Sequence, residues 1–306
     1  MNVAAKLGGF VLAAGLVFGG AYGIGQATGP VGAVPGGAHD SGQHGAAAPP
    51  TSGGLPAGGL MVAQDGYRFD LISGHAAAGT PEDFTFRILG PDGAPVTAFT
   101  PTHDKPLHLI VVRRDLSGFQ HVHPQMGTDG TWRIPLTFPT AGDYRAFADF
   151  APDGRSEAIT LGADVAVAGT YTPAALPTPS RTTTVDGYTV HLDGDLVPGR
   201  TNELTLTVRK AGQPVTDLQP YLAAYGHLVA LRDGDLAYLH VHPEGTPEDG
   251  RTAAGPDIEF MAEVPSPGSY RLFLDFQHGG VVRTAEFTVP TGPAADGGTH
   301  HEGGHS

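Results

Sequence analysis

The chain of 306 residues contains no cysteine. Without thiols it can form neither a disulfide framework nor an iron–sulfur cluster, and it can supply neither a blue-copper ligand set nor a thiol nucleophile. Basic residues are also scarce, because 17 Lys and Arg stand against 31 Asp and Glu and leave a formal net charge of −14. So acidic a chain is a poor partner for nucleic acid or for an anionic membrane surface. We therefore expect neither as a partner.

Recognisable catalytic motifs are missing as well. The sequence has no Gly-x-Ser-x-Gly element, no glycine-rich phosphate loop, no His-Glu-x-x-His helix and no convincingly spaced pair of carboxylates. We therefore expect no catalytic residues and no site for an organic cofactor, and we predict that the protein is not an enzyme.

Turn-forming residues are abundant, with 46 Gly and 27 Pro beside a hydrophobic content of 40%. Alternating apolar and polar residues, as in 67–72 and 83–89, predict half-buried strands. About seven such strands in each half, with no long helix beyond the N-terminus, predict an all-β protein with two tandem β-sandwich domains. The sequence leaves open whether the sandwiches are immunoglobulin-like or cupredoxin-like.

One segment of the chain occurs twice, at 107–124 and at 226–243. Each copy has a histidine followed by an apolar run, then a polar turn, an aromatic residue and a His-x-His-Pro sequence. This order of residues is typical of a β-hairpin. Three histidines recur with one common spacing: His108, His121 and His123 in the first copy, and His227, His240 and His242 in the second.

The hairpin geometry brings the three histidines of each copy together. Residues two apart on a strand point to the same face, and a residue directly opposite lies about 4.5–5.5 Å away between Cβ atoms. Three convergent imidazoles suit Zn²⁺ or Cu²⁺, so we predict one copper or zinc site per copy. If the imidazoles have the ordinary pKa of about 6.5, affinity should fall steeply between about pH 7 and pH 5. The alternative is that these histidines are structural.

Several other residues are candidate accessory groups. Asp149 and Asp275 lie in matching Phe-x-Asp-Phe segments, so each could be a fourth ligand, orient a ligating histidine, or merely cap a turn. Met126 could offer a thioether to Cu⁺, but the second copy lacks its equivalent. His103 and His278 each occur in one copy only and are at best accessory.

The N-terminal segment predicts export. Residues 8–24 carry no charge and would extend about 26 Å as a helix, close to the ~30 Å of a bilayer core. A cleaved signal peptide and a single membrane anchor remain open, and both place the rest of the chain outside the cytoplasm. We predict a signal or anchor at 1–26, a flexible linker at 27–58, sandwich domains at 59–169 and 181–290, a short linker at 170–180, and a disordered His-rich tail at 291–306.

The chain resembles a group of actinobacterial secreted or membrane-anchored proteins that are often encoded near heavy-metal transport genes. The resemblance rests on 105–112 running to 121–124, and on 225–231 running to 238–243. It covers most of 59–290. More distantly, the units are similar to the small β-sandwich modules of bacterial copper-handling proteins. These resemblances imply binding of copper outside the cytoplasm, although the lack of cysteine and of a Met-rich segment favours Cu²⁺ or Zn²⁺ over transfer of Cu⁺.

The sequence thus predicts an extracytoplasmic metal-binding protein that acts in sequestration, resistance or trafficking. Its partners would be metal ions and a membrane metal transporter. Two alternatives are a cell-surface interaction module with structural histidine clusters and a three-His metalloenzyme. Two equivalent sites without a neighbouring general base argue against the enzyme, and six histidines placed alike in two units argue against a purely structural role.

Overall fold

The computed structural model describes residues 57–155, 157–239 and 241–292. This part of the chain consists of strands, turns and loops, and it contains no helix that could cross a membrane. The predicted N-terminal signal or anchor, nearly all of the predicted linker at 27–58, and the tail from residue 293 lie outside the described residues.

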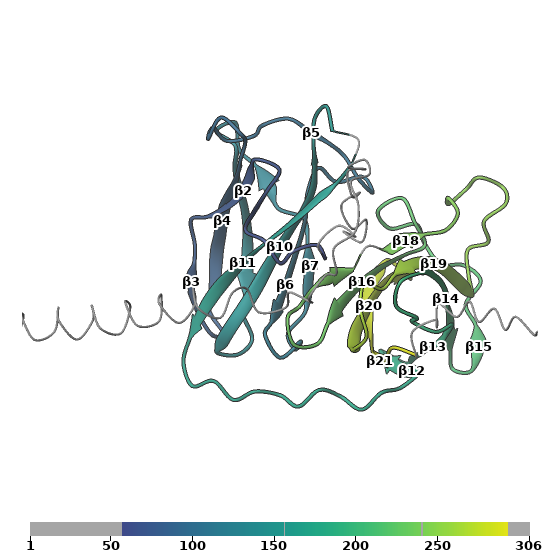
Figure 1. Ribbon diagram of the computed structural model, residues 1–306. Coiled ribbons are helices and arrows are strands. Elements are labelled where there is room, and N and C mark those ends of the chain that lie inside the picture. Colours follow the sequence, from purple (N-terminus) through teal and green to yellow (C-terminus); the bar gives the residue numbers. More distant parts are fainter. Residues whose placement is uncertain (1–56, 156, 240, 293–306) are drawn as a thin grey trace, which may run out of the picture. The chain divides into compact units, whose positions relative to one another are not determined.

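The described residues form two β-sandwiches in sequence (Figure 1). The strands of the first are β1 (Ala63–Gln64), β2 (Tyr67–Leu71), β3 (His75–Ala77), β4 (Pro81–Leu89), β5 (Phe99–Thr100), β6 (His108–Arg113), β7 (Gln120–Val122), β8 (Gln125–Met126), β9 (Thr131–Thr137), β10 (Gly142–Pro152) and β11 (Ile159–Ala168). The strands of the second are β12 (Thr182–Val185), β13 (Tyr188–Asp193), β14 (Thr201–Lys210), β15 (Gln213–Pro214), β16 (Gly226–Arg232), β17 (Tyr238–Leu239), β18 (Val241–Pro243), β19 (Asp257–Glu263), β20 (Ser269–His278) and β21 (Val281–Pro290).

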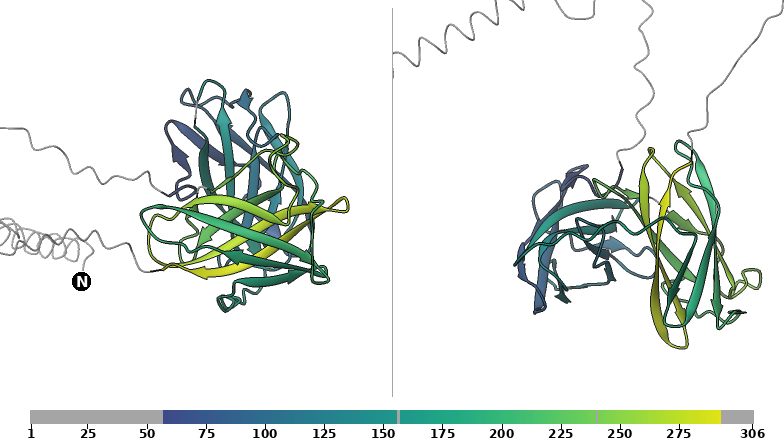
Figure 2. Two further views of the ribbon diagram at one scale, coloured as in Figure 1. Left: turned by 90° about the vertical axis from the view of Figure 1, so that its right-hand side faces the viewer. Right: turned by 90° about the horizontal axis from the view of Figure 1, so that it is seen from below.

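The two sandwiches share one strand order. In the first, the sheet β1-β2-β4-β9-β8 faces the sheet β3-β11-β10-β6-β7. In the second, β12-β13-β14-β19-β18 faces β17-β16-β20-β21, so only the short β3, β5 and β15 lack an equivalent among the described strands. Figure 2 shows the two sheets of each sandwich from two further directions. The predicted all-β fold with two tandem sandwiches and the internal repeat are confirmed.

A tyrosine near the start of β10, and its equivalent near the start of β20, each stabilise the corner turn that leads into the strand. The hydroxyl of Tyr144 donates a hydrogen bond to the carbonyl of Thr140 at 2.9 Å, and that of Tyr270 donates to the carbonyl of Ser266 at 2.8 Å. A tyrosine that bonds back to the backbone a few residues upstream is a feature of immunoglobulin-like sandwiches. Of the two sandwich types that the sequence left open, this corner favours the immunoglobulin-like one.

Strands β6 and β16 are buried on both faces. Leu107, Leu109 and Val111 point into the core of the first sandwich, whereas Ile110 and Val112 point away from it. The outward side chains join those of the second sandwich in an interface cluster: Ile110, Val112, Leu116, Phe147, Val229, Leu231, Leu236 and Phe273. A strand covered on both faces has no polar face, which explains why both runs are uninterruptedly apolar in sequence.

Aromatic rings join the two sandwiches in equivalent pairs. The ring of Phe119, beside β7, stacks on that of Phe273 in β20, with centroids 4.0 Å apart and planes at 3°. In the equivalent pair, Tyr238 in β17 of the second sandwich contacts Phe147 in β10 of the first, with ring centroids 5.8 Å apart. Each hairpin therefore contributes an aromatic side chain to the outer face of the other sandwich.

Candidate metal centre

Three histidines of the first hairpin meet at one end of the interface cluster. In the antiparallel pairing of β6 with β7, Leu109 lies opposite Val122 and Ile110 opposite His121. The next pair in this register is His108 with His123. All three imidazoles therefore leave the sheet on one side, and that side faces the second sandwich, which the spacing did not indicate.

The ring nitrogens of this trio are close enough to share one ion. His108 Nδ1 lies 3.1 Å from His121 Nε2 and also 3.1 Å from His123 Nε2. One nitrogen from each ring can be chosen so that all three lie within 4.8 Å of one another. With Zn–N bonds of about 2.0–2.1 Å, ligands in a tetrahedral shell are roughly 3.4 Å apart. The trio needs little adjustment to reach that spacing.

A backbone carbonyl fixes the orientation of His108. Its Nε2 lies 2.9 Å from the carbonyl oxygen of Thr102, which can only accept, so Nε2 carries the proton and Nδ1 presents its lone pair to the trio. The carbonyl is aimed by a two-residue turn at His103 and Asp104, whose φ angles are 48° and 62°. Such left-handed residues are costly unless the surroundings impose them.

The second copy repeats this arrangement. His227 Nε2 lies 2.9 Å from the carbonyl oxygen of Tyr221 and 3.0 Å from that of Leu222. Leu222 and Ala223 form the same left-handed turn, with φ angles of 54° and 60°. No pattern in a single copy identifies these carbonyls, but in both copies the acceptor lies six residues before the histidine.

A carboxylate of the second sandwich fixes the orientation of His121. Asp275 Oδ2 lies 2.8 Å from His121 Nδ1, and the two side chains are only 5% and 4% exposed. The carboxylate accepts, so Nδ1 carries the proton and Nε2 presents its lone pair to the trio. This is the arrangement in which a second group orients a metal-ligating imidazole.

These two contacts leave two lone pairs facing each other. His108 Nδ1 and His121 Nε2 are 3.1 Å apart, yet neither carries a proton when the rings are neutral. Close approach of two acceptors is unfavourable unless a cation lies between them. His123 can donate from Nε2 to His108 Nδ1, but that proton does not satisfy His121. An extra proton on one ring, or a metal ion between the rings, would relieve this contact.

Burial makes a proton on His108, on His123 or on the nearby His227 costly at neutral pH. Burial, together with the neighbouring imidazoles, lowers the pKa of His108 and of His123 to about 3. Burial likewise lowers the pKa of His227 to about 4, with His103 adding to the effect. At neutral pH these three rings are neutral and available as ligands.

The predicted second site is only partly described. The ring of His227 lies 6.5 Å from that of His108 and 6.4 Å from that of His121, between centroids, so it lies beside the first trio, whose three nitrogens converge without it. His240 lies outside the described residues, and the side chain of His242 is likewise not described. The backbone of His242 lies in β18, opposite Met261 of β19.

The accessory candidates separate into residues near the trio and residues away from it. The ring of His103 lies 5.0 Å from that of His227 and 6.1 Å from that of His108. Asp149 is the cross-strand neighbour of His108, and its carboxylate accepts a hydrogen bond from the hydroxyl of Thr160 at 2.9 Å. Asp149 therefore faces the same interface as the trio.

Met126 and His278 take other roles. Met126 lies in β8 opposite Trp132 and packs against the core of the first sandwich, so it belongs to the packing and not to a loop. His278 lies at the end of β20, where its ring bonds to the hydroxyl of Tyr188 at 2.7 Å and to Asp217 at 3.0 Å. Neither side chain is among the groups that surround the trio.

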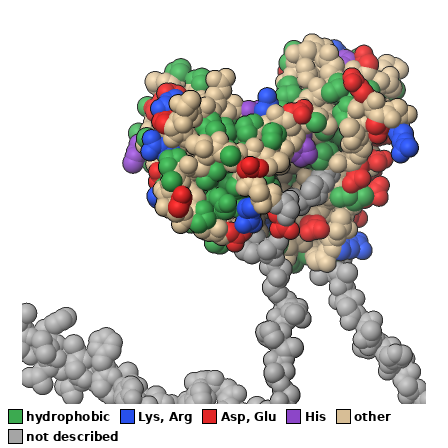
Figure 3. Space-filling view, turned by 90° about the horizontal axis from the view of Figure 1, so that it is seen from above, with side chains coloured by type: hydrophobic (Ala, Val, Ile, Leu, Met, Phe, Trp, Pro, Cys, Tyr) green, Lys and Arg blue, Asp and Glu red, His purple; other side chains and the backbone are tan. Residues whose placement is uncertain are grey.

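A cleft gives access to the histidines. It has a volume of about 1140 Å³ and is lined from both sandwiches, including His103, His108, His121, Asp149 and His227. Figure 3 shows acidic side chains spread over one face of the molecule, with basic side chains scattered among them. Together with the net charge of −14, this surface raises the local concentration of cations.

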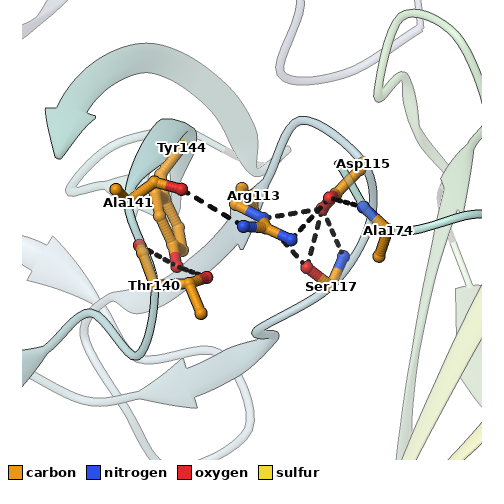
Figure 4. A network of polar contacts seen from close by, with 7 residues as sticks. All are labelled: Arg113, Asp115, Ser117, Thr140, Ala141, Tyr144 and Ala174. Atoms are coloured by element: carbon orange, nitrogen blue, oxygen red, sulfur yellow. Dashed lines mark hydrogen bonds and ion pairs between the residues drawn. The ribbon is translucent and has the colours of Figure 1, made fainter. Parts of the chain in front are cut away.

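A buried ion pair holds the turn of the first hairpin (Figure 4). Arg113 Nη2 lies 2.6 Å from Asp115 Oδ2, and the two side chains are 6% and 7% exposed. The hydroxyl of Ser117 and the backbone N–H of Ala174 also donate to this carboxylate. Although burial raises the pKa of Asp115, the hydrogen bonds from Arg113 and Ser117 outweigh it and hold that pKa below its ordinary value. The second hairpin repeats the pair as Arg232 and Asp235.

A comparison with known protein families finds one family that matches both sandwiches. The chain matches the family described as "Domain of unknown function (DUF8832)" over residues 62–167 and again over residues 183–292. The chain belongs to this family. The two matches cover the two sandwiches, and each contains one copy of the histidine hairpin. A comparison with curated proteins gives no match.

Several solved structures match the chain at low identity. A DUF4426 family protein from Pseudomonas aeruginosa is 9% identical, with a TM-score of 0.28, and the match covers 38% of this chain and all of that one. The Escherichia coli adhesin FdeC is 16% identical, with a TM-score of 0.23, and the match covers 75% of this chain and 65% of the adhesin. Invasin, a bacterial integrin-binding protein, is 12% identical, with a TM-score of 0.22, and the match covers 76% and 41% respectively. Identities and scores this low carry no inference about function.

Proposed function

We propose that this is an exported metal-binding protein that holds Cu²⁺ or Zn²⁺ through His108, His121 and His123. The observation that carries the proposal is the pair of lone pairs, on His108 Nδ1 and His121 Nε2, held 3.1 Å apart by fixed hydrogen bonds on the far side of each ring. A borderline cation satisfies both nitrogens at once, and neutral imidazole is a preferred ligand for Zn²⁺ and Cu²⁺.

The proposed site resembles one that binds and releases its metal ion more than one that holds a permanent structural ion. Three protein ligands leave a fourth coordination position for an exchangeable ligand, whereas structural zinc sites are closed by four protein ligands. Two members of the trio, His108 and His121, line the cleft, which offers a path for the ion. We propose sequestration or trafficking of the metal outside the cytoplasm, with a membrane metal transporter as the partner and the N-terminal segment as signal or anchor. The resemblance to actinobacterial proteins encoded near metal-transport genes supports copper as the cargo.

The runner-up function is a surface interaction module in which the histidines only stabilise the boundary between the sandwiches. The buried hydrogen bond from His121 to Asp275 favours that alternative, since it joins the two sandwiches directly. It does not account for the nitrogens that face each other within the trio. The three-His enzyme has less support, because the sequence has none of the recognisable catalytic motifs.

The test is metal titration of the full chain, purified without a metal-affinity step. Wild-type protein should bind Zn²⁺ or Cu²⁺ tightly, and the double variant His108→Ala/His123→Ala should lose that binding. The matched control is His75→Ala/His191→Ala, which removes two exposed histidines outside the repeat and should leave tight binding unchanged. Equal binding by the two variants would show that the metal is held elsewhere, for example by the terminal segments, and would favour the interaction module.

A further inference from the structure

The hydrogen bond between His121 and Asp275 crosses from one sandwich to the other. His121 belongs to β7 of the first sandwich, and Asp275 belongs to β20 of the second, 154 positions later in the chain. Both side chains are almost fully buried. The orientation of one member of the trio thus depends on a residue outside its own sandwich.

Asp275 is itself held in place from its own sheet. Its Oδ1 accepts a hydrogen bond from the hydroxyl of Thr284 on the neighbouring strand β21, at 2.6 Å, while Oδ2 accepts from His121. Asp275 also lies opposite His227 in the pairing of β16 with β20. With both oxygens engaged, the carboxylate presents a fixed acceptor toward the first sandwich.

We propose that Asp275 is the positioning residue of the metal site, and that metal binding and docking of the two sandwiches are therefore one coupled equilibrium. The proposal deepens the proposed function and rests on it. Asp275 holds His121 in the tautomer whose Nε2 is free for the ion. When the sandwiches separate, His121 loses this partner, and a ligand that binds the docked state better must favour docking by the same factor.

The remaining contacts at the boundary allow docking without metal. The stacked rings of Phe119 and Phe273 and the apolar interface cluster involve no ligand of the trio. Metal would therefore tighten an existing boundary and would not create one. The bound ion would then stabilise one end of the apolar interface between the two sandwiches.

The equivalent residue of the first sandwich is built in the same way. Asp149 in β10 accepts a hydrogen bond from Thr160 of the neighbouring strand β11, as Asp275 does from Thr284. It lies opposite His108, as Asp275 lies opposite His227. A carboxylate anchored by a threonine at this position is a feature of both copies, which supports a shared role in orientation.

The first experiment measures Zn²⁺ affinity, and the electron paramagnetic resonance spectrum of bound Cu²⁺, for the full chain carrying Asp275→Ala. Loss of a residue that orients a ligating histidine typically weakens metal binding by about 10–100-fold, and we expect a weakening in this range with altered Cu²⁺ hyperfine coupling. The matched control is Asp217→Ala, which removes the exposed carboxylate bonded to His278 and should change neither readout. Should Asp275→Ala not fold, the near-isosteric Asp275→Asn replaces it, with a weakening of about tenfold expected for the poorer acceptor.

The second experiment measures the distance between the sandwiches. Spin labels are attached at Thr137→Cys and Glu259→Cys, on exposed positions of β9 and β19. The chain has no cysteine of its own, so these two introduced thiols are the only ones that react with the label. Zn²⁺ should narrow the distribution of label–label distances in the otherwise wild-type chain. At the same Zn²⁺ concentration, the labelled chain that also carries Asp275→Ala should show a smaller narrowing.

The outcomes separate the two proposals. If the wild-type trio binds no metal, the proposed function fails and the inference fails with it. If the trio binds metal but Asp275→Ala, or Asp275→Asn in its place, leaves affinity and Cu²⁺ spectrum unchanged, the positioning role is overturned while the proposed function stands. If Zn²⁺ binds without changing the distance distribution of the wild-type chain, the coupling is overturned.

Discussion

The burial of the trio changes the pH range over which metal should be retained. From ordinary imidazoles the sequence predicts a steep loss of affinity below about pH 7. In the folded protein, however, burial lowers the pKa of His108 and His123 to about 3. Protons therefore begin to compete for these two ligands only in far more acidic solution.

The size of the difference follows from the two pKa values. A ligand with the ordinary pKa of about 6.5 loses roughly eightfold in metal affinity between about pH 7 and about pH 5.5, so two such ligands lose roughly 70-fold. A ligand with a pKa near 3 loses almost nothing over that range. We therefore expect His108 and His123 to contribute less than about a twofold loss together.

The assay is competition for Zn²⁺ with a chelator of known proton affinity at several pH values, with fluorescence of the single Trp132 as the monitor of folding. The reference is a surface Zn²⁺ site built from ordinary, solvent-exposed histidines. A loss of about 70-fold or more in wild-type protein that remains folded would refute the argument, because it would show that the trio titrates like exposed imidazoles.

The same shifts predict that the metal-free protein loses stability in acid. The pKa of His108 is lowered to about 3 and that of His227 to about 4 in the folded state, below the value of about 6.5 in the unfolded chain. Between those values the unfolded chain binds more protons, so stability is fully present above about pH 6.5 and falls as the pH drops toward 4. Each histidine contributes roughly 1.4 kcal/mol per pH unit in this window. Denaturant midpoints that do not change with pH across the window would contradict the buried, neutral state of these rings.

Two further predictions concern the frame that holds the trio. Asp115→Ala leaves the buried guanidinium of Arg113 without its carboxylate and should lower the free energy of unfolding by roughly 3 kcal/mol, whereas Asp195→Ala, at an exposed ion pair, should lower it by less than about 1 kcal/mol; urea denaturation checks both. Phe119→Ala removes the ring stacked on Phe273 and should lower the free energy of unfolding by about 2 kcal/mol; an unchanged calorimetric transition would show that this stack does not stabilise the interface.

Local patterns in the sequence were sufficient for the sandwiches and for the trio. Alternation predicted the strands, and the repeated hairpin predicted that His108, His121 and His123 share one patch. These features depend on neighbours within one hairpin, where the period of two and the cross-strand register determine which side chains meet. The apolar run of β6 indicated only a hairpin strand, and the sequence did not show that its outer face is also buried.

The rest depended on contacts that leave no local pattern. The pairing of His121 with Asp275 joins residues 154 positions apart, and packing between two sandwiches follows no periodicity that one chain displays. The carbonyl of Thr102 is equally hidden, since any residue supplies a backbone acceptor and only the left-handed turn aims this one. The sequence pattern therefore identified the histidines that converge and named Asp275 only as one of several accessory candidates, and the carbonyl of Thr102 had no pattern to identify it.

The reciprocal contacts make the pair of sandwiches, and not one sandwich, the unit that can carry the proposed site. Taken alone, the first sandwich would expose Ile110, Val112 and Phe147 to water, and His121 would lose the carboxylate that fixes its tautomer. Burial also keeps His108 neutral, so exposure would return its pKa toward the ordinary value and let protons compete with metal. Apolar packing, tautomer and protonation state thus depend on the same boundary. Because the hairpin is duplicated and each copy packs against the other sandwich, one repeated sequence provides the apolar packing, the carboxylate that fixes the tautomer of His121 and the burial that keeps His108 neutral.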